Sequence, residues 1–193
     1  MKIVQAGEPV LRQRARALTK DEIMLPAIQQ LIEHMRETMH DAPGVGLAAP
    51  QIGLPIQMAV IEDRADYLKA IDPAVLAERE RGAVEFLLLI NPRIVHYSED
   101  TAEFFEGCLS VAGFSALVKR SRSVTVEYLG AAGNELRIEA SGWFARILQH
   151  EIDHLNGTLY IDRMETRTFA TIENVTRHWK DVPVQKVREV LGL

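Results

Sequence analysis

The sequence predicts an α+β fold in which small antiparallel β-sheets pack around a central metal-binding helix. Segments 56–61 and 85–90 are apolar runs of strand length. Segments 117–129 and 134–140 alternate apolar with polar residues on either side of a glycine-containing turn, which is typical of a hairpin. The run 143–156 instead has its apolar residues at helical spacing. One amphipathic helix among several short strands is therefore expected.

Composition and charge are those of an ordinary globular chain. Its 193 residues fit one domain, and 47% of them are apolar and 25% charged. A net charge of −5 argues against direct nucleic-acid specificity. No apolar run approaches the roughly 20 residues that span a bilayer, so no membrane partner is expected. The single cysteine, Cys108, and an N-terminus without the apolar core of a secretory signal predict a cytoplasmic location.

The N-terminal part is expected to contain an irregular arm and then one long helix. The arm covers residues 1–18, which contain Pro9 and several arginines. Thr19 and Glu22 have the spacing of a capping box, which begins a helix. Apolar residues recur behind it at steps of three and four, namely Met24, Ile28, Leu31 and Met35. This stripe predicts a single amphipathic helix that ends near His40.

The middle of the chain combines loops with strands. Segment 41–51 has two glycines and two prolines, so it is either a tight connection or a place where the backbone approaches a ligand. It lacks the residues of a phosphate-binding loop. Residues 62–83 are charged and alanine-rich, which predicts a partly helical surface insertion. The strand at 85–90 is expected to end at the Asn-Pro pair that follows it, before a separate short strand at 94–97.

Two histidines lie four residues apart in the predicted helix. His150 and His154 share one face, with β-carbons about 5–6 Å apart, so both can bind one metal ion. Glu151 lies about 100° further around and can reach a water on that metal. This is the His-Glu-x-x-His pattern of metal hydrolases, in which the glutamate is the general base. The alternative is an exposed polar helix end with two incidental histidines. Ser141 and Asn156 are expected to cap the helix.

Cys108 can be interpreted in two ways. An unpaired cysteine is usually a small buried hydrophobic residue. Its neighbours here, in Glu106-Gly107-Cys108-Leu109-Ser110, are polar or glycine, which favours a thiolate. Such a thiolate could complete a site of one cysteine and two histidines, with a fourth position for water. Because 42 residues separate it from His150, only the fold could bring the three side chains together.

The C-terminal segment, 165–193, is expected to be an extension of the domain. A short strand is predicted at 159–161, weak helix at 168–180, and a last turn or two at 184–191. Four cations raise the hypothesis of docking on the ribosome, whereas interleaved acidic residues favour a solvated mixed face. The four cations are Arg177, Lys180, Lys186 and Arg188.

Three stretches together resemble the signature motifs of the peptide deformylase family, in order and at plausible separations. They are Gly44-Val45-Gly46-Leu47-Ala48-Ala49-Pro50-Gln51, Glu106-Gly107-Cys108-Leu109-Ser110 and Gln149-His150-Glu151-Ile152-Asp153-His154. The similarity extends from Met1 to about Asp162. The loop between 62 and 85 and the stretch 167–169 resemble the mitochondrial-like branch of the family. The resemblance implies a single catalytic domain over 1–193.

The resemblance also implies an activity and its parts. The family removes the N-formyl group from the N-terminal formyl-methionine of nascent polypeptides and releases formate. Cys108, His150 and His154 would hold one divalent metal ion, Fe²⁺ in the family, with Zn²⁺ or Ni²⁺ as substitutes. Glu151 would take the proton of the attacking water. The side-chain amide of Gln51 and the backbone N–H of Leu109 would donate to the oxyanion.

Substrate contacts follow from the same resemblance. Backbone around Val45, Gly46 and Gly107 would pair with the peptide as an added strand, and an apolar pocket would accept the methionine side chain. Two positions depart from the family pattern. Ala112 stands where proline is usual, and Ser115 stands where many members have an arginine that holds the substrate backbone.

Two other functions are compatible with parts of the pattern. An ordinary zinc peptidase would need only the His-Glu-x-x-His helix, although a cysteine as third ligand counts against it. A non-catalytic metal-stabilised binding module is suggested by Ala112 and Ser115.

Overall fold

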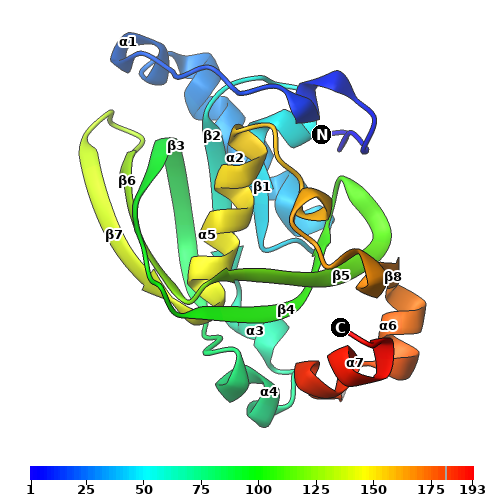
Figure 1. Ribbon diagram of the computed structural model, residues 1–193. Helices are drawn as coiled ribbons and strands as arrows, with labels where there is room; N and C mark the ends of the chain where they lie inside the picture. Colours follow the sequence, from blue (N-terminus) through cyan, green and yellow to red (C-terminus); the bar gives the residue numbers. More distant parts are fainter. Residues whose placement is uncertain (181) are drawn as a thin grey trace.

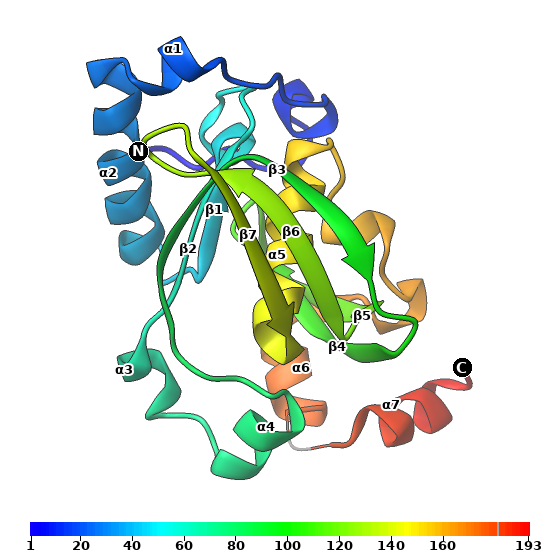
Figure 2. The ribbon, with the colours of Figure 1, turned by 90° about the vertical axis from the view of Figure 1, so that its left-hand side faces the viewer.

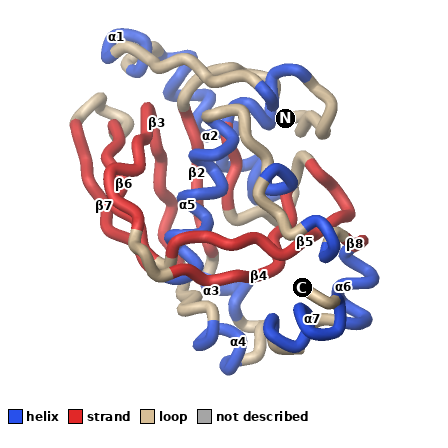
Figure 3. Tube along the Cα trace, in the orientation of Figure 1, coloured by secondary structure: helices blue, strands red, loops and turns tan. Residues whose placement is uncertain are grey.

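Two antiparallel sheets surround one central helix in the computed structural model, which describes residues 1–180 and 182–193. The central helix, α5, contacts strands of both sheets, and it lies in the middle of the molecule (Figure 1; Figure 3). This arrangement confirms the predicted α+β fold. None of the described helices is long and apolar enough to cross a membrane.

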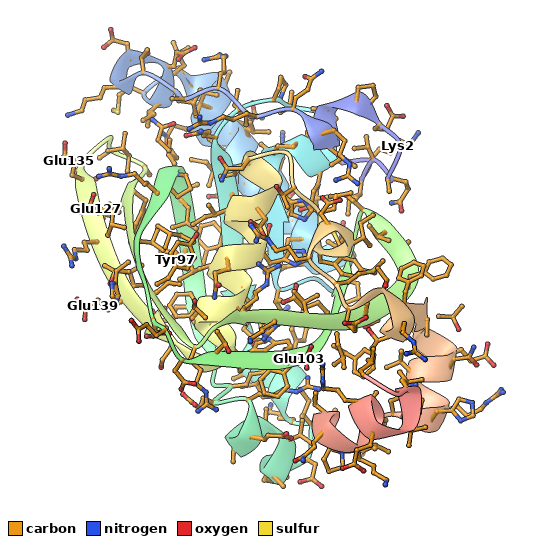
Figure 4. The ribbon with its side chains drawn as sticks, viewed as in Figure 1. Lys2, Tyr97, Glu103, Glu127, Glu135 and Glu139 are labelled. Atoms are coloured by element: carbon orange, nitrogen blue, oxygen red, sulfur yellow. The ribbon has the colours of Figure 1, made fainter. Side chains whose placement is uncertain are left out.

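The larger sheet has five strands in the order β1-β2-β3-β6-β7. Their bounds are β1 Gly46–Ala48, β2 Met58–Asp63, β3 Val84–Tyr97, β6 Ser123–Leu129 and β7 Glu135–Ser141. The side of the sheet at β7 is charged: Glu135 and Glu139 of β7 and Glu127 of β6 point away from the molecule (Figure 4). Charged side chains on an outer strand discourage pairing with another chain.

Helices pack on both faces of this sheet at β2 and at residues 88–90 of β3, which are buried on both sides, whereas β7 is largely exposed. Val60 and Leu88 pack with helix α2, Pro26–Asp41, on one face. The next residues along the same strands, Ile61 and Leu89, pack against α5 on the other. The alternation follows from the two-residue period of a strand. Figure 2 shows the sheet between the two helices.

Strand β3 differs from the prediction, because it continues through the Asn-Pro pair to Tyr97. The ladder to β6 shifts register between Ile90 and Arg93, and Asn91 adopts a positive φ of 49°. A bulge of this kind accommodates a proline, which cannot donate to the ladder. The Asn91 side chain is held there by accepting from the Leu18 N–H at 2.9 Å and donating to the Leu18 carbonyl at 2.8 Å.

The smaller sheet has the order β4-β5-β8, with bounds Thr101–Cys108, Val111–Ser121 and Ala170–Thr171. Segment 117–129 was predicted to be one strand of a hairpin, and this prediction was wrong. The strand breaks at Arg122, and the residues before and after the break belong to different sheets. The backbone N–H of Arg122 donates to Asp100 and its carbonyl accepts from Gly142, which takes both groups out of the ladders. The hairpin formed by β6 and β7 is confirmed.

The expected long N-terminal helix is two helices. Helix α1, Lys20–Ile23, begins at the predicted capping box. Leu25 is then extended, because the residue before a proline avoids helical angles, and Pro26 begins α2. Met24 lies in this break and is 60% exposed, so it does not belong to the apolar stripe. The stripe continues instead through Met35 and Met39, which are fully buried.

Helix α5 spans Gly142–Leu155, with Ser141 and Asn156 at the predicted cap positions, although the Ser141 hydroxyl makes no capping bond. Gly142 has a φ of 58°, and a β-carbon there would lie 2.4 Å from Cβ of Glu80. Glycine is therefore required where α5 begins. Residue Glu80 follows two short helices, α3 Ala65–Leu68 and α4 Pro73–Glu78.

The C-terminal segment is helical in short pieces. Residues predicted as a strand at 159–161 form part of a 3₁₀ turn, Tyr160–Asp162, in which the Asp162 carboxylate accepts from the Leu159 N–H. Helices α6, Ile172–His178, and α7, Val184–Leu191, follow β8. Arg188 of α7 pairs with Glu103 of β4 at 3.0 Å, and Figure 4 labels Glu103 beside α7. Three further 3₁₀ turns are Pro9–Arg12, Ala49–Ile52 and Thr166–Thr168.

Candidate metal centre

Three side chains from two elements converge on one point. Cys108 ends strand β4, and His150 and His154 lie one turn apart on α5. One donor atom of each lies within 4.8 Å of the others. The Cys108 sulfur is 3.3 Å from Nε2 of His154, and the two imidazole rings are 4.9 Å apart. Bonds of about 2.0–2.3 Å to a single ion can span such separations.

The donor set fits a borderline-soft divalent cation. A thiolate with two imidazoles suits zinc or ferrous iron, and imidazole also suits nickel. The tertiary structure therefore brings together the three residues that the sequence selected, across the 42 residues that separate Cys108 from His150.

Glu106 orients one of the histidines. Its Oε2 lies 3.0 Å from Nδ1 of His150, which directs the other ring nitrogen toward the cluster. Burial alone would raise the pKa of Glu106. The charge of Arg120 and the hydrogen bonds from His150 and Arg120 outweigh it and hold that pKa well below its usual range. Glu106 is therefore a buried carboxylate that accepts from a ligand ring.

A buried ionic network holds Glu106 in place. Arg120 donates to Glu106 at 2.7 Å and to Asp153 at 2.8 Å. Arg146 also pairs with Glu106 and donates to the carbonyls of Val118 and Ala102. All four charged side chains are less than 9% exposed. Glu106 and Asp153 stand in two of the quoted motifs, but sequence analysis assigned no role to either. Arg120 and Arg146 lie outside the motifs, and their spacings match no local pattern.

Glu151 lies beside the cluster in a closed environment. It is 4% exposed, and its Oε2 has no hydrogen-bond partner among the described residues. Burial raises its pKa to about 7. Its other oxygen faces Gly46 of β1, where an added β-carbon would lie 2.2 Å away. A carboxyl oxygen with no partner in the described part of the chain is suited to accept a proton from a small molecule next to the cluster.

Gln51 presents its amide to the same place. Its Oε1 accepts from the Ala48 N–H at 2.9 Å, which leaves the amide nitrogen to face the cluster. That nitrogen is 3.5 Å from the Cys108 sulfur and 3.3 Å from the Ser110 hydroxyl. Leu109, next to Cys108, lines the same cavity. Both residues predicted to supply oxyanion donors, Gln51 and Leu109, therefore line the cavity next to Cys108.

A cavity of about 430 Å³ opens onto the cluster. The three residues predicted to pair with a peptide, Val45, Gly46 and Gly107, all line it. Gly46 belongs to β1 and Gly107 to β4, which are the outer strands of different sheets. Trp143 and Ile147 of α5 form an apolar part of the wall.

The two residues that depart from the family pattern lie at different depths. Ala112 lines the cavity, and its N–H donates to the side chain of Gln5 at 3.2 Å. Ser115 is buried, and its hydroxyl donates inward to the Glu106 carbonyl at 2.8 Å. Ser115 therefore supports the chain near the cluster instead of facing the cavity.

Comparisons with known proteins agree on one family. The family model for polypeptide deformylase matches residues 1–170. Peptide deformylase 1A, chloroplastic, of Solanum lycopersicum is 47% identical over 173 residues, which cover 90% of this chain and 62% of that protein. Peptide deformylase 1 of Bifidobacterium longum is 45% identical over 191 residues, covering 98% of this chain and 85% of that protein.

A solved structure is similar over most of its length. The Met-Ala-Ser-bound class I type b peptide deformylase of Acinetobacter baumannii superposes with a TM-score of 0.76 at 30% identity, covering 85% of this chain and 98% of that one. Together these relatives come from a plant chloroplast and from bacteria. They support the family and do not single out the mitochondrial-like branch that the sequence favoured.

Proposed function

The chain belongs to the polypeptide deformylase family, and we propose that it removes the N-formyl group from the N-terminal formyl-methionine of nascent polypeptides. One observation carries the proposal. A buried carboxyl oxygen of Glu151, which has no hydrogen-bond partner in residues 1–180 and 182–193, lies beside a Cys108–His150–His154 cluster. A purely structural metal site would need the cluster but not this carboxyl group.

We propose that Cys108, His150 and His154 hold one divalent cation, Fe²⁺ by resemblance, with Zn²⁺ or Ni²⁺ as substitutes. When bound, such a cation polarises a carbonyl oxygen and makes a neighbouring water more acidic. Which of the three ions is present depends on supply as well as on the donors. Glu106 keeps the ring of His150 in the orientation that binding requires.

In the proposed reaction, Glu151 moves the proton. A water oxygen bonds to the formyl carbon while its proton passes to the Glu151 carboxylate. The negative charge that develops on the formyl oxygen accepts hydrogen bonds from the Gln51 amide and the Leu109 N–H. Glu151 then protonates the amine nitrogen as the carbon–nitrogen bond breaks. This releases formic acid and the amine, and the acid then loses its remaining proton to the amine. Formate and an ammonium N-terminus are the products, so atoms and charge balance.

The substrate is proposed to bind as an added strand between the two sheets. β1 and β4 end their sheets, so backbone at Val45, Gly46 and Gly107 can pair with an extended peptide. Main-chain pairing tolerates many sequences, which suits nascent chains. The apolar wall at Trp143 and Ile147 would accept the methionine side chain. The A. baumannii relative is solved with Met-Ala-Ser bound, the product expected from formyl-Met-Ala-Ser.

The direct test is formate release from formyl-Met-Ala-Ser by protein purified without oxygen, with metal content measured on the same sample. We expect release that stops when a chelator removes the metal and returns when Fe²⁺ or Ni²⁺ is added. Cleavage of an unformylated internal peptide bond would instead favour a zinc peptidase. Peptide binding without formate would favour a binding module.

Oxygen or peroxide should inactivate the iron form, since a thiolate ligand and ferrous iron are both oxidisable.

Gly46→Ala should lower formate release on the order of 10²-fold, because its β-carbon would occupy the place of the Glu151 carboxylate and displace it. Gly46 has no positive φ, so its backbone accepts alanine and the fold should survive. The matched control is Gly82→Ala, where an added β-carbon meets nothing within 4 Å. Equal activity of the two variants would contradict the placement of Glu151.

Several finer proposals rest on the sequence. We propose a single catalytic domain over 1–193 with a surface insertion at 62–83 and an extension at 165–193, a cytoplasmic location, and a place in the mitochondrial-like branch.

Docking of the extension on the ribosome is a weaker proposal, because three of the four cations that suggested it pair with carboxylates. These pairs are Arg177–Glu173, Lys186–Glu189 and Arg188–Glu103. Unchanged co-sedimentation with ribosomes after deletion of 175–193 would remove it.

A further inference from the structure

The C-terminal segment reaches the substrate cavity. Ile172, the first residue of α6, lines the same cavity as Trp143 and Ile147, although sixteen residues of chain separate it from the end of α5. Ile172 is 51% exposed although it lines the cavity. It therefore presents apolar surface at the opening of the cavity, where a bound peptide would leave the metal centre.

Hydrogen bonds and stacking hold this segment against β5. The N–H of Glu165 donates to the Leu117 carbonyl at 2.8 Å, and the hydroxyl of Thr168 accepts from the Leu117 N–H at 2.9 Å. The rings of Phe114 and Phe169 stack 4.9 Å apart with planes within 9°. These contacts hold the segment that leads to Ile172 against β5.

On the β5 side, the neighbourhood of Ile172 is apolar. In β8, Thr171 pairs with Phe114 of β5, and Phe169 precedes Ile172 by three residues. Both residues of the stacked pair are therefore near Ile172, one across the ladder and one along the chain. Phe114 and Phe169 are 38% and 40% exposed. On the β5 side the cavity is lined by Ala112 and Gly113. Arg146 also lines the cavity, but its guanidinium is paired with Glu106.

We propose that Ile172, supported by Phe114 and Phe169, forms an apolar subsite for the side chain of the third residue of the formylated peptide. In an extended peptide, side chains alternate between two sides, so the first and third residues point the same way, about 6.6 Å apart. If the methionine enters the cavity at Trp143 and Ile147, the third side chain follows it toward the opening, where Ile172 lies. This inference rests on the proposed function and adds a substrate preference to it.

The test compares formyl-Met-Ala-Phe with formyl-Met-Ala-Lys. Wild-type protein should show a kcat/KM ratio of about three to ten in favour of the phenylalanine peptide, as expected for burying part of a ring at a partly exposed site. Ile172→Asp should bring that ratio below one, because a carboxylate there repels the ring and attracts the lysine. A ratio measured within one variant cancels any loss of active protein.

Val190→Asp is the matched control, since Val190 of α7 is 60% exposed and the charge change is identical. It should keep the wild-type ratio. Equal ratios for the two aspartate variants would overturn the subsite. If Ile172→Asp cannot be purified, Ile172→Ser should move the ratio toward one, and an unchanged ratio would count against the proposal. Absence of formate from every peptide with wild-type protein would overturn the proposed function itself, a distinct result.

Discussion

Replacing Glu151 with glutamine should lower kcat for formate release by about 10²–10⁴-fold, the usual contribution of a general base. Glutamine has nearly the same shape but cannot accept the proton of water. The metal content should stay at the wild-type value, because the proposed donors are Cys108, His150 and His154. Formate release and metal content are measured on the same preparation. Glu151→Ala should give the same pattern.

Two further measurements separate a catalytic loss from a damaged fold. The Oε2 atom of Glu151 has no described partner to lose, so the thermal midpoint of Glu151→Gln should lie within a few degrees of wild type. Glu33→Gln, at an exposed position on α2, is the control for the chemical change and should keep full activity. Turnover retained by Glu151→Gln would exclude Glu151 as the base.

Glu106→Ala should be the most destabilising single change near the site, with a loss of about 3–5 kcal/mol in the free energy of unfolding. It leaves the buried guanidiniums of Arg120 and Arg146 without their shared carboxylate. It also removes the acceptor that orients His150, so metal affinity should fall about 10–100-fold. Urea unfolding of metal-free protein gives the first quantity, and competition with a chelator gives the second.

Glu127→Ala provides the comparison for this loss. Glu127 pairs with Arg93 at 2.8 Å on the larger sheet, and the two side chains are 41% and 74% exposed. Pairs of that kind contribute at most about 1 kcal/mol. Equal losses of stability from Glu106→Ala and Glu127→Ala would show that the buried network does not hold the site. Unchanged metal affinity in Glu106→Ala would show that it does not orient the histidine.

Two of the errors of sequence interpretation concern where strands begin and end. Residues 117–129 were expected to be one strand on the basis of alternation, yet the chain leaves one sheet and enters the other at Arg122, within the polar run 119–123. Alternation reports which side chains share a face and carries no information on which strand is the partner. Similarly, Asn91 and Pro92 were expected to end a strand, whereas a bulge anchored on Leu18 lets β3 continue.

What the sequence determined by itself was the chemistry of the site. Two imidazoles and a carboxylate on one helix are set by the 3.6-residue turn, which is a local property, and the three motifs together indicated the family. The tertiary structure decided which distant groups meet them. Cys108 reaches α5 because β4 ends beside it, Arg120 and Arg146 enclose Glu106, and Ile172 returns to the cavity because β8 pairs with β5. These contacts depend on the order and pairing of strands in two sheets. Spacing along the chain does not encode that order, because contacts between distant residues depend on how the whole core packs.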